Sequence, residues 1–227
     1  MAEELRKKAI ELAETFKNMP PGSEMGKFYD QMEPDVYNEM LSVVNFTEKD
    51  VVCKQIYETL ALEKESWILD AGCGPGTIAE MLHSKGYENI HGADASEKFI
   101  EFCKSKPWYK DCDAFYFGEG LDAFPEKLKG KFDCCCASGV FVPNHMPPSA
   151  MDDIHCSLKS GGYFVTAMRS YLWEDGEKHG YKDKIEELIK AGKMKLVSKG
   201  DFTRGYKDGI EMFAEQPSIF VVLQRTD

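Results

Sequence analysis

A glycine-rich turn beside two carboxylates is the part of this chain whose residue types could bind a ligand. The stretch WILDAGCGPGTIAEML places Asp70 just before a turn that contains Gly72, Gly74 and Gly76. Glycines let a backbone approach a ligand closely, and the N-terminus of the following helix favours polar or anionic groups. The dinucleotide motif G-x-G-x-x-G needs a third glycine where this chain has Thr77. The turn therefore indicates a ligand other than a dinucleotide.

Acidic residues lie near the ends of the first three predicted strands, where they could contact different parts of a nucleoside ligand. Asp94, in GADAS, follows Asp70 by 24 residues and ends the second predicted strand, where a carboxylate can bind ribose hydroxyls. A carboxylate at Asp70 would repel a pyrophosphate and suits an amino group or a sulfonium. The third predicted strand ends near Glu119, which could contact a base. These residues predict a ligand with a cation, a ribose and a base, and without phosphate.

The elements that position these residues alternate between strand and helix. Apolar runs predict strands over 66–72, 88–96, 113–120, 131–140, 163–170, 194–202 and 218–226, and helices over 77–86, 97–105, 147–162 and 180–192. This alternation predicts an α/β fold with a parallel sheet. Only the loop 204–217 joins the last two strands, so we expect the last strand to run antiparallel. Residues 3–18 and about 30–63 have helical spacing, which predicts a helical cap over 1–63 and a core over 64–227 within a single domain.

With LDAGCGPG followed by Asp94, the sequence resembles the class I S-adenosylmethionine-dependent methyltransferases over about residues 25–225. Three stretches resemble methyltransferase-like proteins of animals within that class: FYDQMEPDVYNEML, FDCCCASGVFVPNHMPPSAMDDIHCSLKSGGYF and TAMRS. The resemblance implies a Rossmann-like sheet of seven strands in the order 3-2-1-4-5-7-6, with the last strand antiparallel. It also implies S-adenosylmethionine as cofactor and S-adenosylhomocysteine as product.

The resemblance assigns cofactor-binding roles to residues along the strand ends. The glycine turn would hold the methionine part, Asp94 the ribose, and Glu119 with Gly120 the adenine. Many members have GDA where this chain has GEG at 118–120. The full set of expected cofactor-binding residues is Tyr29, Tyr37, Asp70, Gly72, Cys73, Gly74, Asp94, Ala95, Ser96, Glu119, Gly120, Ala137 and Ser138.

Candidate acceptor residues follow the fourth and fifth predicted strands. His145, in VPNHMPP, is either a base or hydrogen-bond donor facing the acceptor, or a loop histidine that bonds the backbone. Arg169 could bind a substrate carboxylate bidentately or form a surface ion pair, and Tyr171 could line the acceptor site or only pack. Tyr29, in the cap, is the second candidate catalytic residue beside His145.

Composition restricts the partners and the compartment. The net charge of −11 disfavours nucleic acid, because the basic residues are interleaved with acids. No apolar run has the length to span a membrane. The eight cysteines include no C-x-x-C pair, which favours reduced thiols in the cytosol. No group of His, Cys and Asp residues has the spacing of metal ligands. Cys134, Cys135 and Cys136 should alternate between the faces of a strand.

The function predicted from these residues is methyl transfer to a small-molecule acceptor in a lidded pocket. Nitrogen is slightly favoured over oxygen, because no strong base is evident and a neutral amine needs none. A protein methyltransferase of the same fold and a cofactor-binding protein without activity remain alternatives. A dinucleotide-dependent oxidoreductase is disfavoured by Thr77 and Asp70.

Overall fold

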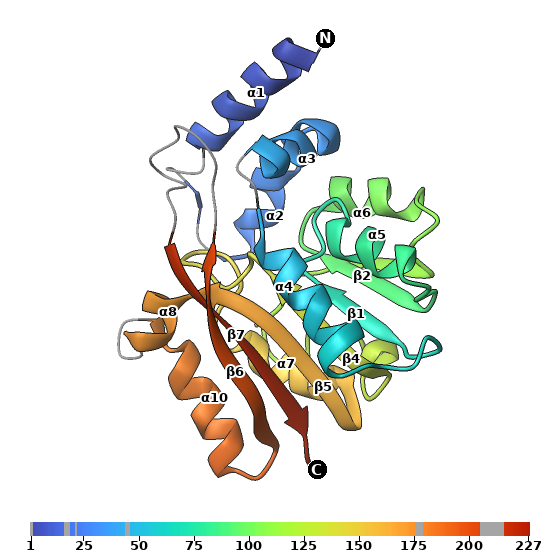
Figure 1. Ribbon diagram of the computed structural model, residues 1–227, viewed down its shortest axis with the longest axis vertical. Helices are drawn as coiled ribbons and strands as arrows, with labels where there is room; N and C mark the ends of the chain where they lie inside the picture. The colour runs from blue at the N-terminus through green and yellow to red at the C-terminus, as the bar shows by residue number, and fades with distance from the viewer. Residues whose placement is uncertain (1, 16–18, 21, 44–45, 176–178, 205–215) are drawn as a thin grey trace.

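Seven strands form one mixed sheet in the order β3-β2-β1-β4-β5-β7-β6, which confirms the expected strand order (Figure 1). The computed structural model describes residues 2–15, 19–20, 22–43, 46–175, 179–204 and 216–227. The strands are β1 (Ile68–Ala71), β2 (Ile90–Asp94), β3 (Asp111–Ala114), β4 (Phe132–Ser138), β5 (Leu158–Arg169), β6 (Met194–Arg204) and β7 (Gln216–Arg225). The pairs among β1 to β5 are parallel, whereas β7 pairs antiparallel with β5 and β6, as the short connection predicted.

Helices cover both faces of the sheet. α4 (Glu48–Lys54) and α5 (Thr77–Ser84) pack on one face, and α7 (Ala150–Ser157) and α10 (Tyr181–Lys190) pack on the other. α6 (Glu97–Lys104) packs against β2 and β3. In the described part of the chain, the other helices are α1 (Ala2–Thr15), α2 (Glu24–Tyr29), α3 (Pro34–Val43) and α8 (Ser170–Glu174), with a π-helical turn at Gln55–Thr59 and a 3-10 turn at Glu126–Leu128.

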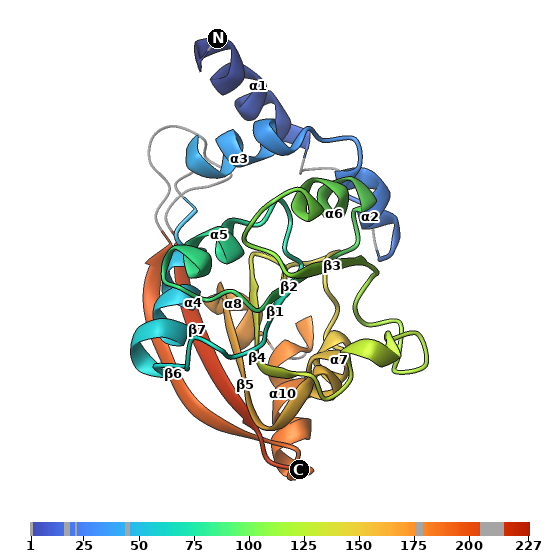
Figure 2. The ribbon, with the colours of Figure 1, turned by 90° about the vertical axis from the view of Figure 1, so that its right-hand side faces the viewer.

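Helices α1, α2 and α3 lie beyond the carboxyl ends of the strands, in the upper part of Figures 1 and 2. The helix predicted over 3–18 corresponds to α1, and the region predicted over 30–63 divides into α3, α4 and the π-helical turn. Pro34 begins α3, where its missing N–H costs nothing because the first helical turn has no backbone acceptor for it. α2 was not predicted, since the stretch NMPPGSEMG was interpreted as a break between helices.

The third strand is shorter than predicted. We expected it over 113–120, but β3 ends at Ala114, the partner of Asp94 at the end of β2. β3 pairs with β2 alone, so its ladder stops where β2 stops. The apolar residues that follow instead form an aromatic cluster of Phe115, Phe117 and Phe124, with ring centroids 4.6 to 6.2 Å apart. The alternation in this stretch therefore reflects burial of aromatic rings and not a longer strand.

The cysteines are packed as small apolar residues. Cys135 belongs to the core on the side of α7, whereas Cys134 and Cys136 belong to the core on the side of α4 and α5. This is the alternation expected for neighbours in a strand. All eight cysteines are free thiols, and burial raises the pKa of the Cys134 thiol well above its usual value. The three consecutive cysteines thus fill the interior on both faces of β4.

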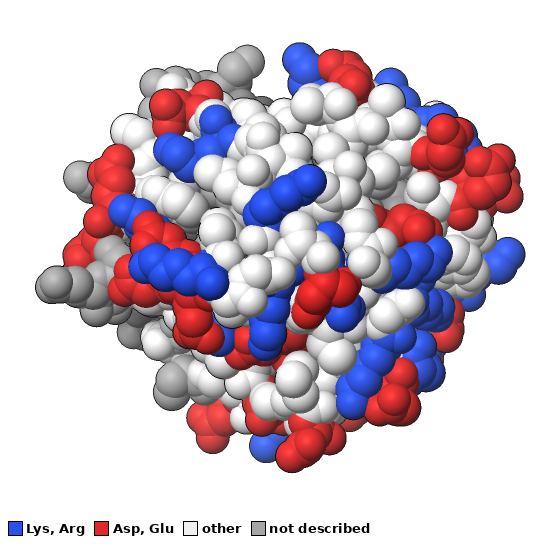
Figure 3. All heavy atoms as spheres, turned by 90° about the horizontal axis from the view of Figure 1, so that it is seen from below, with Lys and Arg blue, Asp and Glu red and all other residues white. Residues whose placement is uncertain are grey.

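The surface carries interleaved charges. On the face at the amino ends of the strands, Lys and Arg side chains are interspersed with Asp and Glu (Figure 3). Within the described part of the chain, no helix combines the length and the apolar character needed to cross a membrane.

Candidate functional site

A cavity of about 440 Å³ lies at the carboxyl ends of the strands, beneath α2 and α3. Ligand sites in proteins have volumes of roughly 300 to 1,000 Å³, and in open α/β sheets they lie at this edge. The predicted site residues that line the cavity are Tyr29, Tyr37, Gly72, Cys73, Gly74, Asp94, Ala95, Ser138, His145, Arg169 and Tyr171. The cavity therefore brings together candidates from both the cofactor set and the acceptor set.

The glycine turn after β1 is held close to its neighbours by backbone contacts. The N–H groups of Gly72 and Cys73 donate to the Ala93 carbonyl oxygen at 2.8 and 3.0 Å. Gly72 has a φ of +69°, and a Cβ there would collide with the Val140 side chain. Only glycine allows the turn to adopt this conformation at this separation.

Asp94 ends β2 with its carboxylate fixed by two backbone donors. Gly74 N–H donates to Oδ2 at 2.8 Å, and Ser96 N–H donates to Oδ1 at 2.9 Å. Burial raises the pKa of Asp94, while these two hydrogen bonds oppose the rise. Ser96 caps α6 through its hydroxyl, which accepts from Phe99 N–H at 3.1 Å. Asp94 thus lines the cavity. Ser96 both donates its N–H to Asp94 and caps α6, so the start of this helix is fixed next to the carboxylate.

Asp70 lies beneath the turn and outside the cavity lining. The Tyr109 hydroxyl donates to its Oδ2 at 2.8 Å, and its buried Oδ1 has no hydrogen-bond partner among the described residues. Burial raises the pKa of Asp70 to about 7, and the nearby charge of Asp94 contributes to the rise. The Asp70 carboxyl group is therefore close to the glycine turn but does not face the cavity.

Two tyrosines from the N-terminal helices and one loop histidine form the roof. The Tyr29 hydroxyl and His145 Nε2 are 2.7 Å apart, and the Tyr29 and Tyr37 rings meet edge to face at 5.8 Å. His145 Nδ1 is 3.3 Å from the Pro143 carbonyl oxygen, which can only accept, so we assign the ring proton to Nδ1. Nε2 then accepts from Tyr29. Burial lowers the pKa of His145 to about 4, so the imidazole is neutral near pH 7.

α2 is tied to the end of β2 by direct contacts. A Cβ on Gly26 would collide with the Ala95 carbonyl oxygen, so glycine allows the helix to approach the strand end. The Asp30 carboxylate accepts from the Ser96 hydroxyl at 2.7 Å and from Lys98 N–H at 3.1 Å. These contacts place Tyr29, at the end of α2, over the cavity.

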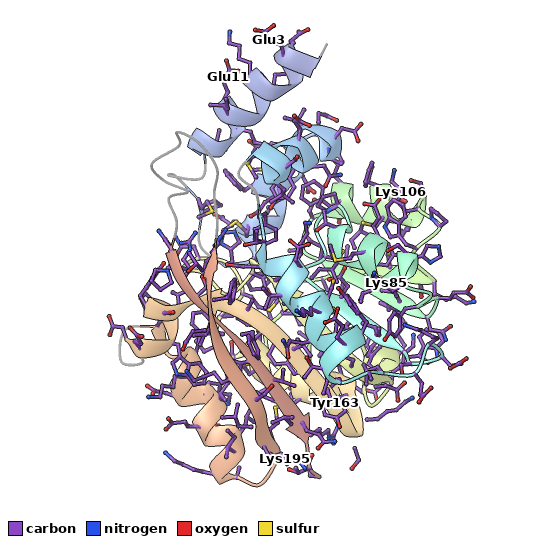
Figure 4. The ribbon with its side chains drawn as sticks, viewed as in Figure 1. Glu3, Glu11, Lys85, Lys106, Tyr163 and Lys195 are labelled. Atoms are coloured by element: carbon purple, nitrogen blue, oxygen red, sulfur yellow. The ribbon has the colours of Figure 1, made fainter. Side chains whose placement is uncertain are left out.

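Two arginines mark the opposite side of the cavity. Arg169 ends β5, and its Nη1 donates to the Tyr171 hydroxyl at 3.3 Å. Arg204 ends β6, and its Nη1 is 2.8 Å from Glu48 Oε1 on α4. In Figure 4, Tyr163 and Lys195 lie near the bottom of the view, toward the amino ends of the same two strands. Both arginines are therefore at the carboxyl edge with the rest of the cavity.

Some expected residues lie elsewhere. Glu119 and Gly120 are exposed and do not line the cavity, because β3 ends early and Phe115, Tyr116 and Phe117 line it instead. Ala137 is buried within β4, behind Ser138. Four residues at the site were not predicted from the sequence, namely Glu48, Arg204 and the lining methionines Met25 and Met40.

A further group of ligand-type side chains lies outside the cavity. Ligand atoms of His91, Asp111 and Asp113 lie within 4.8 Å of one another, although their spacing did not suggest a metal site. Lys127 Nζ is 2.7 Å from Asp113, and Lys131 Nζ is 3.5 Å from His91 Nδ1. Burial and Lys131 lower the pKa of His91. The two ammonium groups supply positive charge to these carboxylates.

Known proteins match the chain in sequence and in fold. Residues 68–162 match a family model described as a methyltransferase domain. Human methyltransferase-like protein 27 is 25% identical over 166 residues, which are 73% of this chain and 66% of that protein. The chain thus spans slightly less than two thirds of that relative's length.

Two solved structures are similar across most of the chain. A Haloferax volcanii protein, solved in complex with a methyltransferase activator, has a TM-score of 0.64 at 11% identity and covers 92% of this chain and 98% of its own. Magnesium protoporphyrin IX methyltransferase from Synechocystis PCC 6803, solved with bound S-adenosylhomocysteine, has a TM-score of 0.53 at 14% identity and covers 78% of this chain and 81% of its own.

Proposed function

We propose that the chain is a class I S-adenosylmethionine-dependent methyltransferase and that it methylates a small-molecule acceptor, with nitrogen slightly favoured over oxygen. One observation carries the proposal. The glycine turn with Asp94 and the hydrogen-bonded pair Tyr29–His145 line the same cavity. S-adenosylmethionine supplies the electrophilic methyl group when it is bound. The chain's own residues bind both ligands, align the acceptor and exclude water.

The residues present fit the cofactor. A carboxylate oxygen can accept two hydrogen bonds, so Asp94, with one backbone donor on each oxygen, keeps acceptor capacity for ribose hydroxyls. The backbone of Gly72, Cys73 and Gly74 holds the methionine part, with Asp70 adding negative charge behind it. Ala95 and Ser138 flank the ligand. We assign the adenine to the aromatic stretch 115–117, which lines the cavity, in preference to Glu119 and Gly120.

The acceptor side favours a nitrogen nucleophile. His145 has a pKa of about 4, so it is a weak base, and burial raises the pKa of the Tyr29 phenol well above its usual value. A neutral amine attacks without losing a proton first, whereas a hydroxyl needs a base. Tyr29 and His145 orient the acceptor by hydrogen bonding, and Tyr171 forms part of its wall.

We propose further that the chain is a single methyltransferase domain, with residues 1–63, whose helix α4 also packs on one face of the sheet, as a cap over the core 64–227. The contacts of Gly26 and Asp30 with the end of β2 support this assignment. A cap that carries Tyr29 and Tyr37 would enclose a small acceptor away from water. We place this activity in the cytoplasm, where free thiols persist.

Isothermal titration with S-adenosylhomocysteine tests the cofactor assignment. We expect binding in the micromolar range, and a folded protein that binds none at high micromolar ligand would refute it. A screen of small amines, carboxylated amines and phenols for S-adenosylhomocysteine release then tests the acceptor class. If the cofactor binds but no small acceptor reacts, a protein acceptor or a binding role without turnover becomes the better explanation.

A further inference from the structure

The arginine side of the cavity has more cationic than anionic groups. Arg169 and Arg204 both line the cavity, from strands that β7 separates in the sheet. Arg204 is 6% exposed and pairs with Glu48, which is 1% exposed. Among the described residues, two guanidinium groups against one carboxylate leave one positive charge on this side. Among the described residues that line the cavity, Asp94 is the only acid, and it lies at the glycine turn.

Arg169 carries the charge that Glu48 does not pair. Among the described residues, its Nη1 donates to the neutral Tyr171 hydroxyl, and its buried Nε has no hydrogen-bond partner. A buried donor left unpaired costs about 1 to 3 kcal/mol, and more when the group is charged. A ligand oxygen at this position would satisfy the donor and the charge together.

The surroundings place this guanidinium beside the acceptor. Its charge acts on the pKa of His145, and also on the pKa values of Glu48 and Arg204. Arg169 thus acts electrostatically on both pairs and lines the same cavity as Tyr29, His145 and Arg204. The cavity lining also includes the apolar side chains of Met40, Phe46, Val140 and Val142. The Phe46 ring also packs against the Arg204 guanidinium, at 5.3 Å.

We propose that the acceptor is a compact organic monoanion, with a carboxylate held by Arg169 and an apolar body that presents its nucleophile to Tyr29 and His145. This inference rests on the proposed methyl transfer and names its substrate class. A single carboxylate balances the one excess charge, and its two oxygens match the planar fork of a guanidinium. A phosphate dianion would exceed that charge.

The test compares carboxylates with their neutral amides. The probes are 3-aminobenzoate with 3-aminobenzamide, and 3-hydroxybenzoate with 3-hydroxybenzamide, titrated calorimetrically into full-length protein saturated with S-adenosylhomocysteine. We expect each carboxylate to bind at least about tenfold more tightly than its amide, since charge-assisted hydrogen bonds are roughly twice as strong as neutral ones. Arg169→Gln should abolish the preference, and Arg169→Lys should retain part of it. Lys195→Gln removes a cation from the far end of β6 and should change nothing (Figure 4).

Cofactor affinity separates the possible failures. Arg169→Gln should bind S-adenosylhomocysteine within twofold of the wild type. A tenfold loss would show that Arg169 holds the cofactor's own carboxylate, which overturns the inference. Equal affinity for carboxylate and amide, or no detectable binding of either, also overturns it while cofactor binding stays intact. Loss of cofactor binding by the wild type would instead be a failure of the proposed function.

Discussion

The two sides of the cavity differ in the sign of their buried charge and in the groups that stabilise it. On the carboxylate side, at β1 and β2, Asp94 is held by two backbone N–H groups, and Asp70 accepts from a tyrosine hydroxyl. On the arginine side, at β5 and β6, Arg204 is neutralised by the side chain of Glu48, while Arg169 bonds a hydroxyl. The backbone N–H groups are neutral, so the negative charge of Asp94 remains on the carboxylate side. On the arginine side, Glu48 cancels one of the two guanidinium charges of the described residues, and one positive charge remains.

This difference indicates which ligand each side can accept. The carboxylate side attracts a positively charged group, in keeping with a cofactor that carries an ammonium and a sulfonium. The arginine side attracts an anion, in keeping with the proposed acceptor. The neutral pair Tyr29–His145 lines the same cavity, and we propose that the nucleophile and the methyl group meet beside it.

The largest expected effect is on the carboxylate side, where pH controls stability through Asp70. Its pKa is about 7 in the folded chain and about 3.9 in an unfolded one. The folded state therefore binds the proton more tightly, and its stability is lost as pH rises from 4 to 7. At about 1.4 kcal/mol per pKa unit, Asp70→Asn should gain as much as about 4 kcal/mol over the wild type across this range.

Denaturant unfolding of the ligand-free protein at pH 4, 5.5 and 7 measures this difference. The matched control is Asp111→Asn, whose carboxylate is exposed at the amino end of β3. A stability difference between Asp70→Asn and the wild type that does not change with pH would show that the Asp70 pKa is ordinary.

The next effect is on the arginine side. Glu48→Gln removes the charge that balances Arg204 and should destabilise the fold by about 3 kcal/mol, because an unpaired buried charge remains. Combining it with Arg204→Met should restore much of the loss. Denaturant midpoints at pH 7 measure both variants. If the denaturant midpoint of Glu48→Gln equals that of the wild type, Glu48 does not neutralise a buried guanidinium, and our charge balance for this side is wrong.

Asp94→Asn tests the carboxylate side through cofactor binding. The amide keeps one acceptor but loses the charge, and it presents an NH₂ to one of the two backbone donors. Hydrogen bonds to charged groups contribute about 1.5 to 3 kcal/mol, so S-adenosylhomocysteine affinity should fall by roughly 100-fold. Calorimetric titration measures the loss, again with Asp111→Asn as control. An unchanged affinity would remove Asp94 from the ribose site.

The carboxylate side was the more predictable of the two from sequence. The glycine turn and Asp94 each follow a short apolar strand directly, so local patterns identify both. Glu48 and Arg204 were missed because each has an ordinary local context, and only the packing of α4 near the end of β6 brings them together. Arg169 was identified only because it ends a predicted strand.

The wrong length of the third strand shows a second limit of local patterns. The stretch DAFYFGEG alternates apolar residues as a strand does, yet its ladder depends on how far β2 extends beside it. Glu119 and Gly120 were therefore placed at a strand end that does not exist, and Phe115 and Phe117 were assigned to the strand itself. Pairing length is set by the neighbour, and a single segment does not encode it.

The smallest expected effect concerns the neutral pair Tyr29–His145. Tyr29→Phe keeps the ring that packs against Tyr37 and Phe99 but loses the hydrogen bond to His145. If the acceptor is an amine, kcat should fall by about tenfold or less, because orientation is lost but no proton transfer is needed. An acceptor that must lose a proton would show a fall of roughly 100-fold or more, since general base catalysis contributes at least that much. S-adenosylhomocysteine affinity should change by less than about twofold, so a large binding loss would place Tyr29 on the cofactor and not on the acceptor.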